Sequence, residues 1–189
     1  GKTYQTAYLE KMNKFLNTKN LFGFYNNKKI FDMRGFFFKV FDSEVYKKSK
    51  YKHVIKQVNI SNNKKKGTIR GLHYQINKYK EQKTIICIRG SIFDVLVDIR
   101  RNSKNYLKCF KNKISEKNGK ILIVPIGFAH GYQTLEKNTQ VLYLHSNTYS
   151  KKNERSLNPM DASLNIKWPI KIKHVSTKDK KTRMINDKM

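Results

Sequence analysis

Short runs of apolar and β-branched residues recur along the chain from Phe36 onward. Each run has roughly five to eight residues, and turn-forming segments such as Ser61-Asn62-Asn63 and Lys117-Asn118-Gly119 separate them. The predicted strands are Phe36–Phe41, Val54–Ile60, Thr68–Tyr74, Thr84–Arg89, Ile92–Ile99, Ile121–Pro125, His130–Leu135 and Gln140–Ser146. Many short strands at close spacing indicate an all-β fold, a sandwich or barrel with a few short helices.

The run Ile92–Ile99 alternates with a period of two, as expected for a strand with two unlike faces. Asp94 and Asp98 fall on one face. The other face is apolar and carries Phe93, Val95, Val97 and Ile99. The pattern predicts a core side and a polar side.

A length of 189 residues suits one domain. We assign residues 12–189 to a single domain and residues 1–11 to an N-terminal extension or leader remnant, in which a short helix is the alternative. The segment Asp42-Ser43-Glu44 would cap a short helix that runs through Lys50. The polar tail after Trp168 is expected to wrap the surface.

Composition excludes several classes of protein. Two cysteines, Cys87 and Cys109, cannot cross-link a fold of this size and have no CxxC metal spacing. They favour a reducing compartment, and we expect a cytoplasmic protein. No apolar run approaches the roughly 20 residues of a membrane span. A membrane protein, a disulfide scaffold and a long disordered chain are therefore excluded.

The formal net charge of +28 is the strongest compositional signal. Only seven of the 41 basic residues are Arg, and the lysines are spread along the whole chain. Because Lys and Asn codons are both rich in A and T, a biased genome could produce this surface without a nucleic-acid partner. A basic balance also fits an anionic ligand, either a polynucleotide or a small molecule. We do not expect nucleic acid to be the partner.

Polar residues within predicted strands are the first candidates for a site, because burying an unpaired polar group costs about 1–3 kcal/mol. Strict alternation puts Arg70 and His73 on opposite faces of their strand. A bulge at Gly71, which lies between them, could bring both to one side. The alternative is a buried, hydrogen-bonded His73 and an exposed Arg70.

Two further segments combine histidine with glycine or tyrosine. Gly127 and Gly131 flank His130 and would set its imidazole at the mouth of a strand; a turn with a surface histidine is the alternative. Tyr143 and His145 share one face of a strand, where aromatic residues usually belong to the core.

Other chemistries fit the sequence less well. His73 and His130 with a carboxylate could form a metal site, but the HxH pair that many β-barrel metal sites use is missing. The sequence has no GxSxG turn, no P-loop and no GxGxxG fingerprint. We predict neither a metal nor a cofactor.

Together these segments resemble the dTDP-4-dehydrorhamnose 3,5-epimerase family. The resemblance runs from about Phe31 to Asp179. Three blocks in this order carry most of it, namely Arg70-Gly71-Leu72-His73-Tyr74-Gln75, Phe93-Asp94-Val95-Leu96-Val97-Asp98-Ile99-Arg100 and Gly127-Phe128-Ala129-His130-Gly131.

The resemblance implies a cupin-type jelly roll, a homodimer and a dTDP-4-keto-6-deoxyhexose substrate. The implied reaction inverts C3 and C5 of dTDP-4-dehydro-6-deoxy-D-glucose to give dTDP-4-dehydro-L-rhamnose. Inverting a carbon beside a ketone needs three groups: a base for the α-proton, a group that stabilises the enolate oxygen, and an acid on the opposite face.

The matched positions supply these groups. His73 resembles the base, a role that suits imidazole near neutral pH. Asp179 resembles the carboxylate that orients this imidazole, with Asp94 as the alternative. Tyr143 resembles the acid, and Lys83 resembles the cation near the enolate.

The eight other matched positions are assigned to substrate binding. The basic residues expected to meet the diphosphate are Arg34, Arg70 and Lys178. The residues expected to contact the nucleotide or the sugar are Gln57 and Asn59 by hydrogen bonds, Tyr149 by stacking on thymine, Glu154 by completing the pocket, and His130 beside the sugar.

The chain also departs from the family pattern. Lys39 stands where a glutamate that helps bind the nucleotide is usual, so base preference stays open. Ile126 stands where glutamate is common, and the segment between Gln57 and Gly67 is one residue longer than the family pattern. Because no proton-transfer residue is missing, we expect an active enzyme. The alternatives are a mono-epimerase acting at C3 or C5, and a non-catalytic basic β-barrel that binds nucleic acid.

Overall fold

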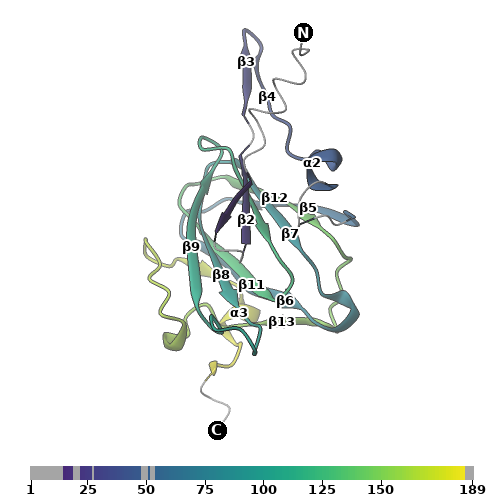
Figure 1. Cartoon of the computed structure of the whole chain (residues 1–189). Coiled ribbons are helices and arrows are strands. Elements are labelled where there is room, and N and C mark those ends of the chain that lie inside the picture. Colours follow the sequence, from purple (N-terminus) through teal and green to yellow (C-terminus); the bar gives the residue numbers. More distant parts are fainter. Residues whose placement is uncertain (1–14, 19–21, 27, 48–50, 52–53, 186–189) are drawn as a thin grey trace.

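Two six-stranded sheets pack against each other in this chain (Figure 1). A computed structural model describes residues 15–18, 22–26, 28–47, 51 and 54–185. The first sheet has the strand order β1 (Phe15–Thr18), β2 (Phe22–Asn26), β10 (Lys120–Val124), β7 (Lys83–Arg89), β12 (Thr139–His145) and β5 (Gln57–Asn63). The second has the order β13 (Glu154–Ser156), β6 (Thr68–Gln75), β11 (Phe128–Thr134), β8 (Ser91–Asp98) and β9 (Cys109–Ser115), with β14 (His174–Val175) parallel to β6.

The remaining elements are short. A hairpin of β3 (Ile30–Asp32) and β4 (Gly35–Phe37) projects away from the two sheets (Figure 1). The helical elements are α2 (Ser43–Lys47), α3 (Thr177–Lys180) and the 3-10 turns η1 (Asn77–Tyr79) and η2 (Ala162–Leu164). No helix in the described part of the chain has the length and apolar character needed to span a membrane.

The predicted all-β fold is confirmed, and each of the predicted runs overlaps a strand. The run Phe36–Phe41 is the poorest match, because β4 already ends at Phe37. The next apolar residues, Phe38 and Phe41, pack on the outer face of the first sheet instead of continuing the strand. The expected helix begins at Ser43, and residues 48–50 at its expected end lie outside the described residues, as does the extension 1–11. The strands that the sequence analysis missed are β1, β2, β3, β9, β13 and β14.

The main core lies between the two sheets and takes apolar side chains from both. Its residues are Phe22, Phe24, Ile85, Cys87, Ile92, Leu96, Ile114, Leu122, Val124, Phe128, Tyr132 and Val141. In β8, Ile92 and Leu96 share this inner face with Asp94 and Asp98, which are also fully buried. The face expected to be the polar side therefore points into the barrel.

The opposite face of β8 is covered by the chain that follows β13. Val95 and Val97 pack against Leu157, Leu164 and Trp168 there. The segment that leads up to Trp168 is therefore an apolar cover for the second sheet, and the tail after Trp168, predicted to wrap the surface, adds β14 to that sheet by pairing with β6.

A bulge interrupts the pairing of β6 with β11, as predicted at Gly71. His130 pairs with His73 but Tyr132 pairs with Arg70, so the register shifts between them. Gly71 has a φ of +110°, and a Cβ on it would lie 2.6 Å from the His130 carbonyl oxygen. Glycine is required because both the backbone conformation and the close approach exclude a side chain.

The bulge predicts a large cost for Gly71→Ala. We expect the free energy of unfolding to fall by about 3 kcal/mol or more, since a positive φ and a collision with backbone act together. Gly35→Ala is the matched control, because Gly35 also has a positive φ but nothing lies within 4 Å of its Cβ position. It should cost about 1–2 kcal/mol. Chemical denaturation measures both, and equal losses would contradict the role of the close approach.

Candidate active site

A cavity of about 660 Å³ opens between β5 and β12 of the first sheet and β6, β13, β14 and α3. Nine of the twelve predicted site residues line it: Asn59, Arg70, His73, Lys83, Tyr143, Tyr149, Glu154, Lys178 and Asp179. Arg70 and His73 line the same cavity, which is what the bulge at Gly71 was predicted to achieve.

His73 and Asp179 form a close pair. Nε2 of His73 lies 2.6 Å from Oδ1 of Asp179, although the two residues are 106 positions apart in sequence. Burial alone would raise the pKa of Asp179, but hydrogen bonds from His73, Ser176 and Gly71 and the nearby imidazole charge lower it overall. The carboxylate is therefore ionised at neutral pH and fixes the imidazole with its proton on Nε2, which leaves Nδ1 free to accept a proton.

The hydroxyl of Tyr143 is held in its protonated form. Burial raises the pKa of Tyr143 well above 10, and the neighbouring Tyr132 hydroxyl adds to the effect. The Tyr143 ring meets the His130 ring edge-on at 6.5 Å and stacks on His145 at 5.8 Å with an interplanar angle of 14°. A phenol in this state can donate a proton but not accept one.

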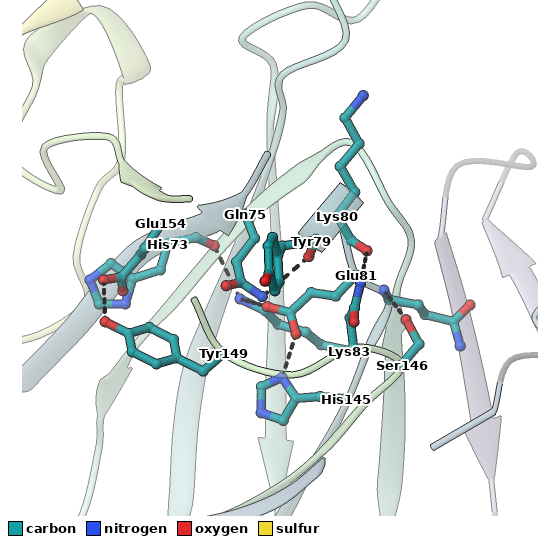
Figure 2. A network of polar contacts seen from close by, with 12 residues as sticks. His73, Gln75, Tyr79, Lys80, Glu81, Lys83, His145, Ser146, Tyr149 and Glu154 are labelled. Atoms are coloured by element: carbon teal, nitrogen blue, oxygen red, sulfur yellow. Dashed lines mark hydrogen bonds and ion pairs between the residues drawn. The ribbon is translucent and has the colours of Figure 1, made fainter. Parts of the chain in front are cut away.

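Lys83 brings a positive charge to a largely buried position. Its Nζ donates a hydrogen bond to the His73 carbonyl oxygen at 3.3 Å and lies 3.5 Å from Oε1 of Glu81. Glu81 also accepts a hydrogen bond from Nδ1 of His145 at 2.9 Å (Figure 2). The ammonium group is thus held between a carboxylate and the backbone of the predicted base.

The outer part of the cavity is rich in hydrogen-bonding groups. Glu154 accepts a hydrogen bond from the Tyr149 hydroxyl at 3.0 Å (Figure 2). It also contacts the ammonium group of Lys178. Burial alone would raise the pKa of Glu154, but Lys178, Tyr149 and His73 lower it. Arg70 is anchored by a 2.7 Å hydrogen bond from Nε to Oδ1 of Asn63.

Gln57 does not line the cavity but supports residues that do. Its Oε1 accepts a 2.8 Å hydrogen bond from the Tyr149 backbone N–H, and its Nε2 donates to Oδ1 of Asn59 at 3.2 Å. One amide hydrogen of Asn59 stays available for a ligand in the cavity, which fits its predicted role next to a nucleotide. Gln57, predicted to bind the nucleotide directly, instead reaches the cavity only through Tyr149 and Asn59.

His130 lies deeper than the sequence analysis predicted. It sits within β11, is 4% exposed and does not line the cavity, so the prediction of an imidazole at a strand mouth is wrong. Its Nε2 lies 2.6 Å from Oδ2 of Asp94. Asp94 is therefore not the partner of His73, because its carboxylate is already used by a second buried pair. Asp94 meets His130 because the two lie on the same inner face of neighbouring strands, where Asp94 pairs with Tyr132 and His130 pairs with Leu96.

Arg34 is the predicted site residue that the structure separates most clearly from the cavity. It lies at the turn of the projecting β3–β4 hairpin, with a side chain 90% exposed and paired with Asp32. Lys39 is also absent from the cavity lining and forms an ion pair with Asp42 at 2.9 Å.

Several lining residues escaped the sequence analysis. Glu81 could have been found from the sequence, because it lies two residues before Lys83 and alternate residues of an extended segment point to the same side. The tail supplies Lys173, Ser176 and Lys180, which no local pattern distinguishes from other polar residues. Within residues 54–185 and the shorter described segments, no group of three His, Cys, Asp or Glu side chains is arranged to hold a metal ion.

Comparison with known proteins identifies the family. The family model described as dTDP-4-dehydrorhamnose 3,5-epimerase matches residues 21–187. The dTDP-4-dehydrorhamnose 3,5-epimerase of Shigella flexneri is 38% identical over 148 residues, which are 78% of this chain and 82% of that protein.

Solved structures agree. A dTDP-4-dehydrorhamnose 3,5-epimerase from Bacillus anthracis with TDP and PPi bound has a TM-score of 0.87 and 32% identity, over 91% of this chain and 99% of that one. A Legionella pneumophila dTDP-6-deoxy-D-glucose-3,5-epimerase in complex with dTDP-4-keto-L-rhamnose has a TM-score of 0.85 and 30% identity, over 92% and 93%. The expected jelly roll is confirmed, and the chain belongs to the dTDP-4-dehydrorhamnose 3,5-epimerase family.

Proposed function

We propose that this chain inverts C3 and C5 of dTDP-4-dehydro-6-deoxy-D-glucose and so produces dTDP-4-dehydro-L-rhamnose. One observation carries the proposal: a single cavity is lined by an imidazole–carboxylate pair, a protonated phenol and a buried ammonium group, from His73, Asp179, Tyr143 and Lys83. Its volume of about 660 Å³ is typical of small-molecule sites. The nucleotide-linked keto sugar bound to the Legionella relative supports the substrate class.

The first half of the reaction is removal of a proton beside the C4 ketone. Nδ1 of His73 accepts the proton from C3 or C5, and the C–H electron pair moves into the carbonyl to form an enolate. Asp179 stabilises the imidazolium that results. The ammonium group of Lys83 stabilises the negative charge on the enolate oxygen, where a preformed buried charge is most effective.

The second half is return of a proton to the opposite face of the carbon. Tyr143 donates its phenolic proton there, and the configuration of the carbon is inverted. Exchange with solvent then restores the phenol and the free imidazole. Because C3 and C5 both flank the C4 ketone, one set of groups serves both carbons.

The diphosphate has several cations available at the cavity. Arg70, Lys173, Lys178 and Lys180 line it, and of these only Lys178 contacts a lining carboxylate, that of Glu154. Charge-assisted hydrogen bonds from such groups bind phosphate oxygens strongly. Tyr149 is 54% exposed and can offer a ring face to thymine.

We also propose a homodimer. The β3–β4 hairpin exposes large apolar side chains, with Phe31 72% and Phe37 65% exposed, and the edge strand β5 exposes Val58 and Ile60. Unpaired edges and apolar patches of this kind are commonly covered by a second chain. Such a dimer would also let Arg34 reach a diphosphate in the partner's cavity, because the hairpin carries it away from its own.

A cytoplasmic location completes the proposal. Cys87 and Cys109 are both free thiols, and burial raises the pKa of Cys87 to about 12. Two unpaired thiols fit a reducing compartment.

His73→Ala tests the base. In deuterated water the wild-type protein should exchange the C3 and C5 protons of the dTDP-keto sugar, and the variant should lose this exchange by about 10²–10⁴-fold. Proton NMR measures both positions. Affinity for dTDP serves as the control for folding. Exchange retained in the variant would rule out His73 as the base, and wild-type exchange at one carbon alone would indicate a mono-epimerase.

Tyr143→Phe tests the acid. The base is intact in this variant, so the α-proton should still exchange with solvent, while the inverted product should form about 100-fold more slowly. The expected signature is therefore a higher ratio of exchange to inversion, read from the same NMR spectra. An unchanged ratio would show that another group delivers the second proton.

Mixing two inactive variants tests the dimer. If each site combines His73 of one chain with Arg34 of the other, a His73→Ala/Arg34→Ala heterodimer contains one intact site. Random pairing of equal amounts should then restore about one quarter of the wild-type activity. Activity no higher than the average of the two separate variants would place Arg34 outside the partner's site. Sedimentation of the wild type checks the dimer itself.

A further inference from the structure

Glu81 is a buried carboxylate that the proposed reaction leaves without a role. Its side chain is 6% exposed, and it joins two residues of the cavity through its two oxygens. Oε1 lies 3.5 Å from Nζ of Lys83, and Oε2 lies 2.9 Å from Nδ1 of His145 (Figure 2). Burying a carboxylate is costly unless it is paired, so its place here depends on both partners.

The direction of the hydrogen bonds around His145 can be deduced from one fixed donor. The Tyr149 backbone N–H can only donate, so the atom of Gln57 that it meets is the oxygen Oε1. Nε2 of Gln57 must then donate to Oδ1 of Asn59, and Nδ2 of Asn59 donates to Nε2 of His145 at 3.3 Å.

This direction determines the state of His145. Its Nε2 accepts a hydrogen bond, so the ring is neutral and carries its proton on Nδ1, from which it donates to Glu81. Glu81 accepts from both sides, from His145 and from the ammonium group of Lys83. An unbroken chain of hydrogen bonds and one ion pair thus runs from the Tyr149 backbone to Lys83.

Both ends of the Glu81–His145 pair contact groups assigned to the chemistry. Lys83 donates to the carbonyl oxygen of His73 at 3.3 Å, and the His145 ring stacks on Tyr143 with an interplanar angle of 14°. The ammonium group and the phenol are therefore both contacted by one largely buried pair, which lines the same cavity beside them.

We infer that Glu81 and His145 are positioning residues that hold Lys83 and Tyr143 in place and link them to the nucleotide end of the cavity. The inference rests on the proposed function, because it assigns the enolate cation to Lys83 and the acid to Tyr143. Small displacements of reacting groups slow an enzymatic step strongly while binding of the distant nucleotide is little changed.

Glu81→Gln tests the carboxylate. The amide keeps the size of the side chain but has one acceptor oxygen for two donors, so either Lys83 or His145 loses its bond. We expect kcat to fall about 10- to 30-fold and KM to change less than about threefold. Glu44→Gln is the matched control, because it removes a lysine-paired carboxylate on the exposed face of α2 and should leave kcat unchanged.

His145→Phe tests the other half of the pair and is informative even if Glu81→Gln fails to fold. Phenylalanine keeps a ring against Tyr143 but removes both hydrogen bonds, so a similar fall in kcat is expected. Substitutions of residues that act through one chain of contacts do not have additive effects on the activation free energy. The double variant should therefore be no more than about threefold slower than the slower single variant. If kcat of the double variant instead fell by the product of the two single-variant losses, the link between Glu81 and His145 would be overturned.

The controls separate the two proposals. Wild-type protein that exchanges neither sugar proton would refute the proposed function itself. Normal wild-type exchange together with wild-type kcat in both variants would refute only the positioning role. A fall in kcat that matches a loss of folded protein, measured by circular dichroism and by dTDP affinity, would also refute it.

Discussion

The close approach of β6 and β11 at two glycines is the constraint on which the cavity depends. A Cβ on Gly71 would meet the His130 carbonyl, and a Cβ on Gly131 would lie 2.6 Å from the carbonyl of Arg70. Only two residues without side chains allow the register shift between these strands. Without the shift, strict alternation would turn either Arg70 or His73 away from the cavity that both now line.

The barrel interior combines an apolar core with buried carboxylates, each of which has a basic side chain as its partner. His130 pairs with Asp94, Asp98 accepts from Arg100, and Glu81 accepts from Lys83 and His145. Each pair is needed because an isolated buried charge is costly. The same pairing fixes side-chain positions before substrate arrives, and such preorganisation is what an enolate-forming site requires.

The fold was largely predictable because its signal is local. Runs such as Ile92–Ile99 carry the period of two that a strand imposes, and turn residues separate them. β9 (Cys109–Ser115) was missed because alternate lysines on its exposed side leave too few apolar residues to mark a strand. The polar face of β8 was misjudged because a sequence cannot tell whether a carboxylate points to water or to a buried imidazole.

The sequence by itself determined the strand pattern, the bulge at Gly71 and the residue types of the cavity, because propensity, glycine and motif spacing act over a few positions. Tertiary structure alone decided which of two aspartates meets His73, since Asp179 arrives from a tail 106 residues away. It also decided that Glu81, His145 and Lys83 form one group and that Arg34 lies away from its own cavity. The contacts of His73 with Asp179 and of Glu81 with His145 join segments 106 and 64 positions apart, which only the folded sheets bring together, and the path of the projecting hairpin sets the place of Arg34.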